Sequence, residues 1–349
     1  MGEIGESFIG LTYKPTDVVS EGGLIVFRSS NIQNGCMDYK DIVRVNRNVK
    51  EKLITKKDDL LVCARNGSAR LIGKNAILHE TDANQTFGAF MMVFRSDKNH
   101  FVHQLLNTRR YSSQVSENLG ARINQITSSD LSSFEFFFPK ENSEMNKISA
   151  LLDLLDERIA TQNKIIDKLQ SLIKGIAQKI VHSNKTNVRL SECVECSSST
   201  LQESDVCEHG AYPVYGANGI VGYLDNYNTE GEAVYIIKDG SGVGTVSYVT
   251  GKCSATGTLN TLQAKEGYSL QFLYYLLKVF NFEPYKTGMA IPHIYFKDYG
   301  KAKVFCPSYT EQLQYARLLS AIDNKLSIEQ NILTNLSLQK QYLLRQMFI

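Results

Sequence analysis

Cysteine and histidine side chains offer the first candidates for chemistry in this chain of 349 residues. Cys193-x-x-Cys196 is followed by Cys207 and His209, and thiolate and imidazole are the ligands that Zn²⁺ prefers. The stretch between the two pairs is short, however, and Cys207-x-His209 is an unusual second pair. We therefore interpret these residues as ordinary reduced side chains and predict no metal site.

A second histidine pair, His100-x-x-His103, lies at the start of a segment from Phe101 to about Asn118 that is typical of a helix. It could also be proposed as a metal site. We interpret both histidines instead as the solvated end of that helix.

The motifs of common active sites are missing from the sequence. It contains no phosphate-binding Gly-x-x-x-x-Gly-Lys-Ser/Thr loop and no Gly-x-Ser-x-Gly nucleophile turn. None of the six prolines stands in the Asp-Pro-Pro or Asn-Pro-Pro run of adenine methyltransferases or begins a Pro-Asp nuclease motif. The glycine-rich stretch 240–244 does not open a helix, so we interpret it as a turn between strands. We expect no catalytic residue here.

Two globular segments share one pattern of elements. In the first, Leu24–Ser29 and Leu60–Ala64 are apolar runs bounded by turn residues, which predicts strands. In the second, Val214–Tyr215 and Ala233–Ile237 are the corresponding runs, and Leu270–Phe280 is predicted to be a helix in the same relative place as 101–118.

A long helix occurs twice. Apolar residues recur at alternating four- and three-residue steps from Ile148 to Ile180, as in the seam of a coiled coil. The same register returns from Tyr315 to Met347, except at Lys340. Gln162 and Glu329 are polar at the same interior position, and we interpret them as fixing the helix register. A solvent-accessible gap in the seam and a contact with a partner protein are the alternatives.

The repeat extends into the globular segments. Three pairs of stretches match in order: 28–32 with 215–220, 65–68 with 238–241, and 123–126 with 291–294. Between these stretches the two halves diverge. The sequence therefore predicts one structural frame used twice, with different surfaces.

Composition sets the limits of these predictions. Length suggests about two domains, and 43% hydrophobic with 21% charged residues is ordinary for a globular protein. Seven cysteines without framework spacing indicate a reducing cytoplasm. No apolar run is long enough for a membrane span, and the start lacks a secretory signal. With a net charge of only +2, any nucleic-acid partner requires basic residues concentrated on particular faces.

Together these features resemble the specificity subunit of type I restriction–modification enzymes. The resemblance rests on residues 151–159 and 318–326 in the long helices, and on 212–220, 288–294 and 344–349 elsewhere. It covers nearly the whole chain. The chain begins at what resembles the first strand of the first domain, without the few residues that usually precede it.

The resemblance implies an α+β fold with two α/β target-recognition domains in a pseudo-two-fold repeat, separated by two long antiparallel coiled-coil helices. We place the first domain at 1–140, the central helix at 141–185, the second domain at 186–306 and the last helix at 307–349. The helices are expected to pair through Leu152, Leu155, Ile159, Gln162, Ile166, Leu319, Ile322, Leu326, Glu329 and Leu333. We expect Leu155 and Ile159 to face the region 322–336.

The implied function is to bind a bipartite, asymmetric sequence in double-stranded DNA and to direct other subunits to it. The partners would be two methyltransferase subunits carrying S-adenosylmethionine and, for restriction, motor–nuclease subunits that use ATP and Mg²⁺. This chain would bind no cofactor, have no activity of its own and be cytoplasmic. A helix of this length spans ~50 Å, so a helix pair would serve as a spacer between half-sites about one DNA turn apart. The alternative is a coiled-coil protein scaffold that does not read DNA.

Groove contacts read sequence, whereas basic side chains on phosphates provide affinity. We expect Arg109, Arg110 and Arg122 to contact phosphates. The other candidate DNA contacts are polar and basic residues in loops after strands: Arg28, Ser29, Asn31, Arg65, Asn66 and Arg70 in the first domain, and Asn218, Lys238, Ser241, Lys286, Thr287 and His293 in the second. Each could instead be a solvated surface or turn residue.

Overall fold

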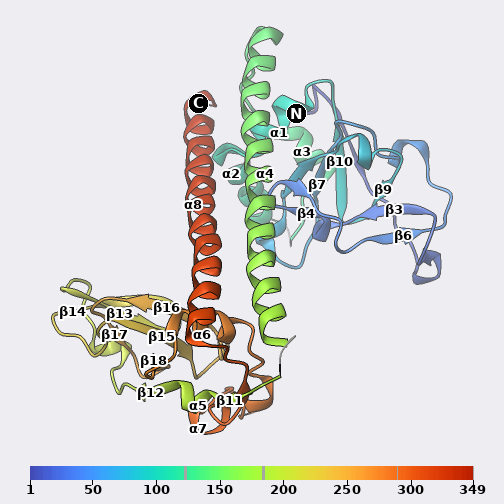
Figure 1. Cartoon of the computed structure of the whole chain (residues 1–349). Helices are drawn as coiled ribbons and strands as arrows, with labels where there is room; N and C mark the ends of the chain where they lie inside the picture. Colours follow the sequence, from blue (N-terminus) through green and yellow to red (C-terminus); the bar gives the residue numbers. More distant parts are fainter. Residues whose placement is uncertain (122–123, 183–184, 289, 349) are drawn as a thin grey trace. The chain divides into compact units, whose positions relative to one another are not determined.

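The computed structural model describes residues 1–121, 124–182, 185–288 and 290–348 (Figure 1). The chain forms two compact units. Unit 1 consists of Met1–Asn163 with Asn331–Ile349, and unit 2 of Lys164–Gln330. Each unit therefore contains one sheet-rich domain and half of each long helix.

Unit 1 has a main antiparallel sheet and a smaller mixed one. The main sheet runs β1 (Glu6–Ile9), β10 (Met91–Arg95), β7 (Leu60–Cys63), β8 (Asn75–Ile77). In the second sheet, β3 pairs parallel with β9 and antiparallel with β6. Its order is β2 (Val18–Val19), β6 (Val43–Val45), β3 (Leu24–Phe27), β9 (Thr86–Phe87), and a hairpin joins β4 (Ile32–Gln33) to β5 (Cys36–Met37).

Strand β7 shows why these runs are apolar throughout. Side chains alternate between the two faces of a strand. Leu60 and Val62 pack in the cluster that includes the helices, whereas Leu61 and Cys63 pack against the second sheet. All four side chains are fully buried. Because both faces of the strand are covered, the sequence shows a continuous apolar run rather than alternation.

Helices cover the outer face of this main sheet. They are α1 (Asn99–Leu105), α2 (Arg109–Ala121) and α3 (Ser128–Ser133). The prediction of one helix over 101–118 is wrong, because the segment breaks between α1 and α2. Thr108 Oγ1 donates to the Leu105 carbonyl at 2.7 Å and accepts from the Tyr111 N–H at 3.4 Å, which satisfies backbone groups at the break.

Unit 2 repeats this plan. Its main antiparallel sheet runs β12 (Val194–Ser198), β18 (Leu259–Ala264), β15 (Glu232–Ile237), β16 (Val246–Thr250). Its mixed sheet runs β14 (Gly219–Leu224), β13 (Tyr212–Gly216), β17 (Ser254–Ala255). The remaining elements are β11 (Val188–Arg189), β19 (Lys303–Val304), α5 (Leu190–Cys193), α6 (Leu270–Lys278) and α7 (Phe296–Tyr299).

The strand orders confirm the internal repeat. β12, β18, β15 and β16 take the places of β1, β10, β7 and β8, and β13 lies parallel to β17 as β3 lies parallel to β9. The glycine-rich stretch 240–244 is a turn between β15 and β16, as expected. The predicted α+β class with two sheet-rich domains and two long helices is confirmed.

The long helices are α4 (Asn142–His182) and α8 (Tyr309–Met347). In unit 1 they run antiparallel, because Phe348, just beyond α8, packs with Met145 near the start of α4, whereas Lys340 contacts Asp156. Leu155 clusters with Leu336, Leu343 and Leu344. Leu155 therefore faces a part of α8 that lies mostly beyond the expected region 322–336. The ion pair with Asp156 explains why a lysine, Lys340, stands in the apolar seam.

Burial follows the predicted seam. Among the predicted pairing residues, Ile159, Ile322 and Leu333 are half-buried. The others are buried: Leu152, Leu155, Gln162, Ile166, Leu319, Leu326 and Glu329. Among the described residues, none of the helices combines the length and apolar character that crossing a bilayer requires.

Candidate nucleic-acid interface

Two loops of unit 1 lie together at the ends of β3 and β7. The amide of Asn66 donates to Ser29 Oγ at 3.1 Å, and the ammonium of Lys74 donates to the Ser29 carbonyl at 3.4 Å. Burial lowers the pKa of Lys74. The structure thus brings together two predicted contacts, Ser29 and Asn66, and adds a cation beside them.

Arg65, beside Asn66, is exposed at the surface and has two defined contacts. Its Nε donates to Gln125 Oε1 at 3.0 Å, and its guanidinium lies 5.7 Å from the centre of the Phe90 ring. Phe90 is 58% exposed, so this cation–π pair lies at the surface. Gln125 was not among the predicted DNA contacts, although residues 123–126 were recognised as part of the repeat.

Arg28 and Asn31 lie in the same loop and have different roles. Arg28 forms an ion pair with Asp41 at 2.7 Å and lines a hollow of about 570 Å³ beside Phe90. Asn31 is fully buried, and its amide donates to the carbonyls of Asp38 and Asp41. Its burial argues against a base contact, because its donors already hold the loop.

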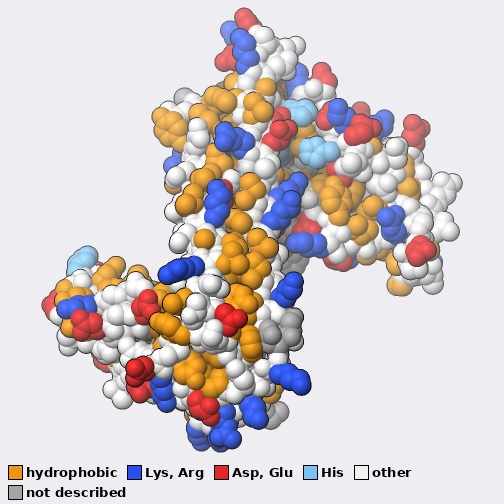
Figure 2. Space-filling model, viewed as in Figure 1, with side chains coloured by type: hydrophobic (Ala, Val, Ile, Leu, Met, Phe, Trp, Pro, Cys, Tyr) orange, Lys and Arg blue, Asp and Glu red, His pale blue; other side chains and the backbone are white. Residues whose placement is uncertain are grey.

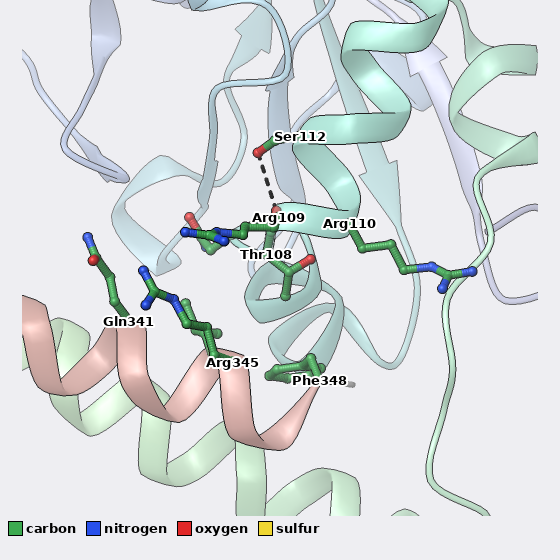
Figure 3. A pocket seen from close by; sticks show the side chains of 9 residues that line it. Thr108, Arg109, Arg110, Ser112, Gln341, Arg345 and Phe348 are labelled. Atoms are coloured by element: carbon green, nitrogen blue, oxygen red, sulfur yellow. Dashed lines mark hydrogen bonds between the residues drawn. The ribbon is translucent and has the colours of Figure 1, made fainter.

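Arg70, a predicted loop contact, is exposed. Of the arginines expected on phosphates, Arg109 and Arg110 lie at the start of α2. Arg109 and Arg345 lie near each other with Gln341 around a hollow of about 450 Å³, while Arg110 points away (Figure 3). Arg345 was missed because it stands in the last turn of a helix predicted for pairing. Arg110 Nε donates to the Glu135 carbonyl; Arg122 lies outside the described residues.

In unit 2 the turn after β15 faces a second loop. His293 Nδ1 lies 2.6 Å from Asp239 Oδ1, within hydrogen-bond distance. Thr287 and His293 exchange backbone hydrogen bonds. Gly240 has φ +89°, a left-handed conformation that glycine adopts without strain. The structure thus brings together four of the predicted contacts: Lys238, Ser241, Thr287 and His293. Asp239 lies among them and was not predicted as a DNA contact.

Two predicted contacts lie elsewhere. Lys286 forms an ion pair with Glu283 at 2.5 Å, and Asn218 is exposed in the hairpin between β13 and β14. Whether any of these residues touches DNA stays a prediction.

Backbone hydrogen bonds define the matching positions of the two loops. Ile126 donates to the Ala64 carbonyl, and Ile294 donates to that of Lys238. Lys238 therefore matches Ala64, and Arg65 matches Asp239. Isolated bridges agree, joining Arg65 to Gln125 and Asp239 to His293. The sequence alignment paired Arg65 with Lys238 because both are basic. In the structure Arg65 matches Asp239, so that alignment is displaced by one position.

The cysteines and histidines considered as metal ligands lie in different surroundings. Cys193 is buried and Cys207 exposed. His100 contacts Asp153 at 2.6 Å, and this hydrogen bond raises the pKa of His100. His103 is only 4% exposed, so the interpretation of His103 as part of a solvated helix end is wrong. It failed because α4 covers this face of α1.

Comparison with known proteins agrees with the fold and the repeat. The family described as "Type I restriction modification DNA specificity domain" matches residues 1–171 and 182–338. The chain belongs to this family.

Individual relatives are more distant. The chain is 27% identical over 191 residues to the type I restriction enzyme EcoKI specificity subunit of Escherichia coli K12, a match covering 52% of this chain and 40% of that protein. It is 27% identical over 182 residues to the StySPI specificity subunit of Salmonella potsdam, covering 49% and 38%. The matches thus span less than half the length of these relatives.

The fold also matches a solved structure. A crystal structure of the S subunit of a type I restriction–modification system from M. genitalium aligns with a TM-score of 0.70 at 19% identity. The alignment covers 100% of this chain and 94% of that one. At this identity the match defines the fold, and the roles of individual side chains rest on their own geometry.

Proposed function

We propose that this chain is the DNA sequence-specificity subunit of a type I restriction–modification system. The observation that carries the proposal is the difference between two equivalent loop crossings. Unit 1 presents Arg65 with Gln125, and unit 2 presents Asp239 with His293, on the same backbone frame. Such a repeat suits a reader of two half-sites that differ in sequence.

The chemistry of each couple fits base edges. A guanidinium pairs with guanine O6 and N7, and a carboxylate accepts from the amino group of cytosine. Arg65 retains donors beyond those that bind Gln125. Unit 1 would therefore select for guanine, and unit 2 for cytosine or another amino-bearing base, at the position each couple reaches.

The proposal extends to partner subunits, which the exposed helix surfaces support. Figure 2 shows hydrophobic side chains at the surface along the long helices. In unit 1, Leu154, Leu338 and Tyr342 are each about 60% exposed. These apolar faces suit methyltransferase subunits, which would supply S-adenosylmethionine, while ATP and Mg²⁺ would belong to motor–nuclease subunits. The chain itself would be non-catalytic and act in the cytoplasm.

The first experiment asks whether the assembled complex has a split target. The full chain is co-purified with its methyltransferase partner, and adenine methylation is mapped on genomic DNA. We expect methylation at one bipartite sequence. A stable complex that methylates without sequence preference would overturn the proposal and favour a coiled-coil scaffold.

A second experiment tests the couples directly. The double substitution Asp239→Arg with His293→Gln places the side chains of the unit 1 couple in unit 2. We expect the preferred base to change at one position of one half-site, with the other half-site unchanged. Glu230→Gln, at an exposed ion pair of the same domain, is the matched control and should leave both half-sites unchanged. Changes in both half-sites would contradict the assignment.

A further inference from the structure

A buried polar cluster joins α1 to the long helices in unit 1. His103 and Gln104 on α1 meet Asp153 and Asp156 on α4, and Lys340 on α8 completes the cluster. His103 is 4% exposed and Gln104 fully buried. The proposed DNA function does not use this cluster.

His103 stands out because neither ring nitrogen has a hydrogen-bond partner. Gln104 Oε1 also lacks one. A buried polar atom without a partner destabilises the fold, so such atoms require a reason. A neutral imidazole has one ring nitrogen with a free lone pair, which is the form that binds metals.

Carboxylates surround this lone pair. One ligand atom each from His103, Asp153 and Asp156 lie within 4.8 Å of one another. A metal ion bound by all three would be in reach of the buried Gln104 amide, whose Nε2 donates to Asp153 at 2.9 Å and to Asp156 at 3.0 Å.

We propose that His103, Asp153 and Asp156 bind a divalent transition-metal ion such as Zn²⁺. One imidazole nitrogen and two carboxylate oxygens are ligands that Zn²⁺ accepts, with water available for a fourth position. Mg²⁺ and Ca²⁺ are disfavoured because they prefer oxygen ligands alone. The ion would fasten α1 to α4, and the proposal does not depend on DNA binding.

Lys340 sets the strength of the site. Its ammonium contacts Asp156 Oδ1 at 2.5 Å, whereas Oδ2 accepts only from Gln104 among the hydrogen bonds of the described residues. His100 Nδ1 also contacts Asp153 Oδ2 at 2.6 Å, so Asp153 Oδ1 and Asp156 Oδ2 are the carboxylate oxygens that remain for a metal ion. The Lys340 ammonium repels the metal ion, so its removal should raise the affinity.

Unit 2 does not repeat these ligands. Asp323 occupies the place of Asp156 in the helix repeat, but Tyr275 donates to it at 3.2 Å. Ser320 stands where Asp153 would be. Unit 2 therefore serves as an internal comparison that should bind no ion at this junction.

The test uses the full chain after treatment with a chelator. Zn²⁺ is titrated in competition with a chromophoric indicator, and Co²⁺ is followed by its visible absorption. We expect one equivalent at this site, more than roughly tenfold weaker binding in His103→Asn and Asp153→Asn, and tighter binding in Lys340→Met. His209→Asn, in unit 2, is the control and should keep this site. Mg²⁺ should not compete.

Asp153 is partly exposed, so Asp153→Asn keeps the test informative if His103→Asn fails to fold. Absence of a one-equivalent site in the wild-type chain would overturn the proposal. So would binding that survives in Asp153→Asn or is lost in His209→Asn, since the ion would then lie elsewhere.

Discussion

The two units have the same sheet and attach it to the long helices by different contacts. In unit 1, α1 packs through the ring of Phe101, 5.3 Å from that of Phe348, and also through a buried polar cluster around His103. In unit 2, α6 meets α8 through rings, with Phe272 and Tyr315 6.3 Å apart, and through Tyr275 on Asp323. The backbone frame therefore tolerates different chemistry at equivalent positions. The loops follow the same rule, and specificity can change there without changing the fold.

The largest expected effect concerns two asparagines that the sequence match pairs. Asn31 is buried with its amide donating to two carbonyls, whereas Asn218 is exposed. We expect Asn31→Ala to lower the free energy of unfolding by about 3 kcal/mol, because it leaves buried acceptors unsatisfied. Asn218→Ala should change it by less than about 0.5 kcal/mol. Urea denaturation measures both, and equal losses would refute the contrast.

Next comes the polar junction of unit 1. Lys340→Met should cost about 2 kcal/mol in metal-free buffer, because Asp156 loses its cation in a largely buried place. Thermal or urea unfolding would measure it. The control Lys252→Met removes an exposed pair with Glu230 and should cost at most about 0.5 kcal/mol. A stable Lys340→Met variant would mean that the junction depends on its apolar neighbours alone.

Arg65→Ala should reduce discrimination at one base pair of one half-site about tenfold, or roughly 1.4 kcal/mol. Arg70 is an exposed neighbour. We expect Arg70→Ala to weaken DNA binding uniformly across sequences instead. Methylation rates on duplexes carrying single base changes measure both. Uniform weakening by both variants would assign Arg65 to the phosphate backbone.

The smallest effect tests the aromatic junction of unit 2. Tyr275→Phe removes one hydrogen bond to Asp323 and should cost about 1 kcal/mol in the urea unfolding of unit 2. Tyr274→Phe keeps the ring contacts and should be nearly neutral. A Tyr275→Phe cost as large as that of Lys340→Met would remove the distinction between the two junctions.

Periodicity predicted the long helices and the repeat, because a seam of apolar residues has one simple structural solution, whereas the α+β class was implied by the family resemblance. Periodicity could not predict the burial of His103, which depends on α4 covering α1 from a distant part of the sequence. Nor could it separate Asn31 from Asn218, since the same residue type suits a loop anchor and an exposed turn. Gln125 and Asp239 were missed because their roles come from pairing across loops.

The division of the chain into units has a consequence for its synthesis. Unit 2 is one contiguous stretch, Lys164–Gln330, inserted between the two parts of unit 1. A ribosome therefore completes unit 2 before it makes Lys340 and Phe348, which unit 1 needs for its helix packing. The domain that is translated first is thus the last to be finished, and it waits for the final turns of the last helix.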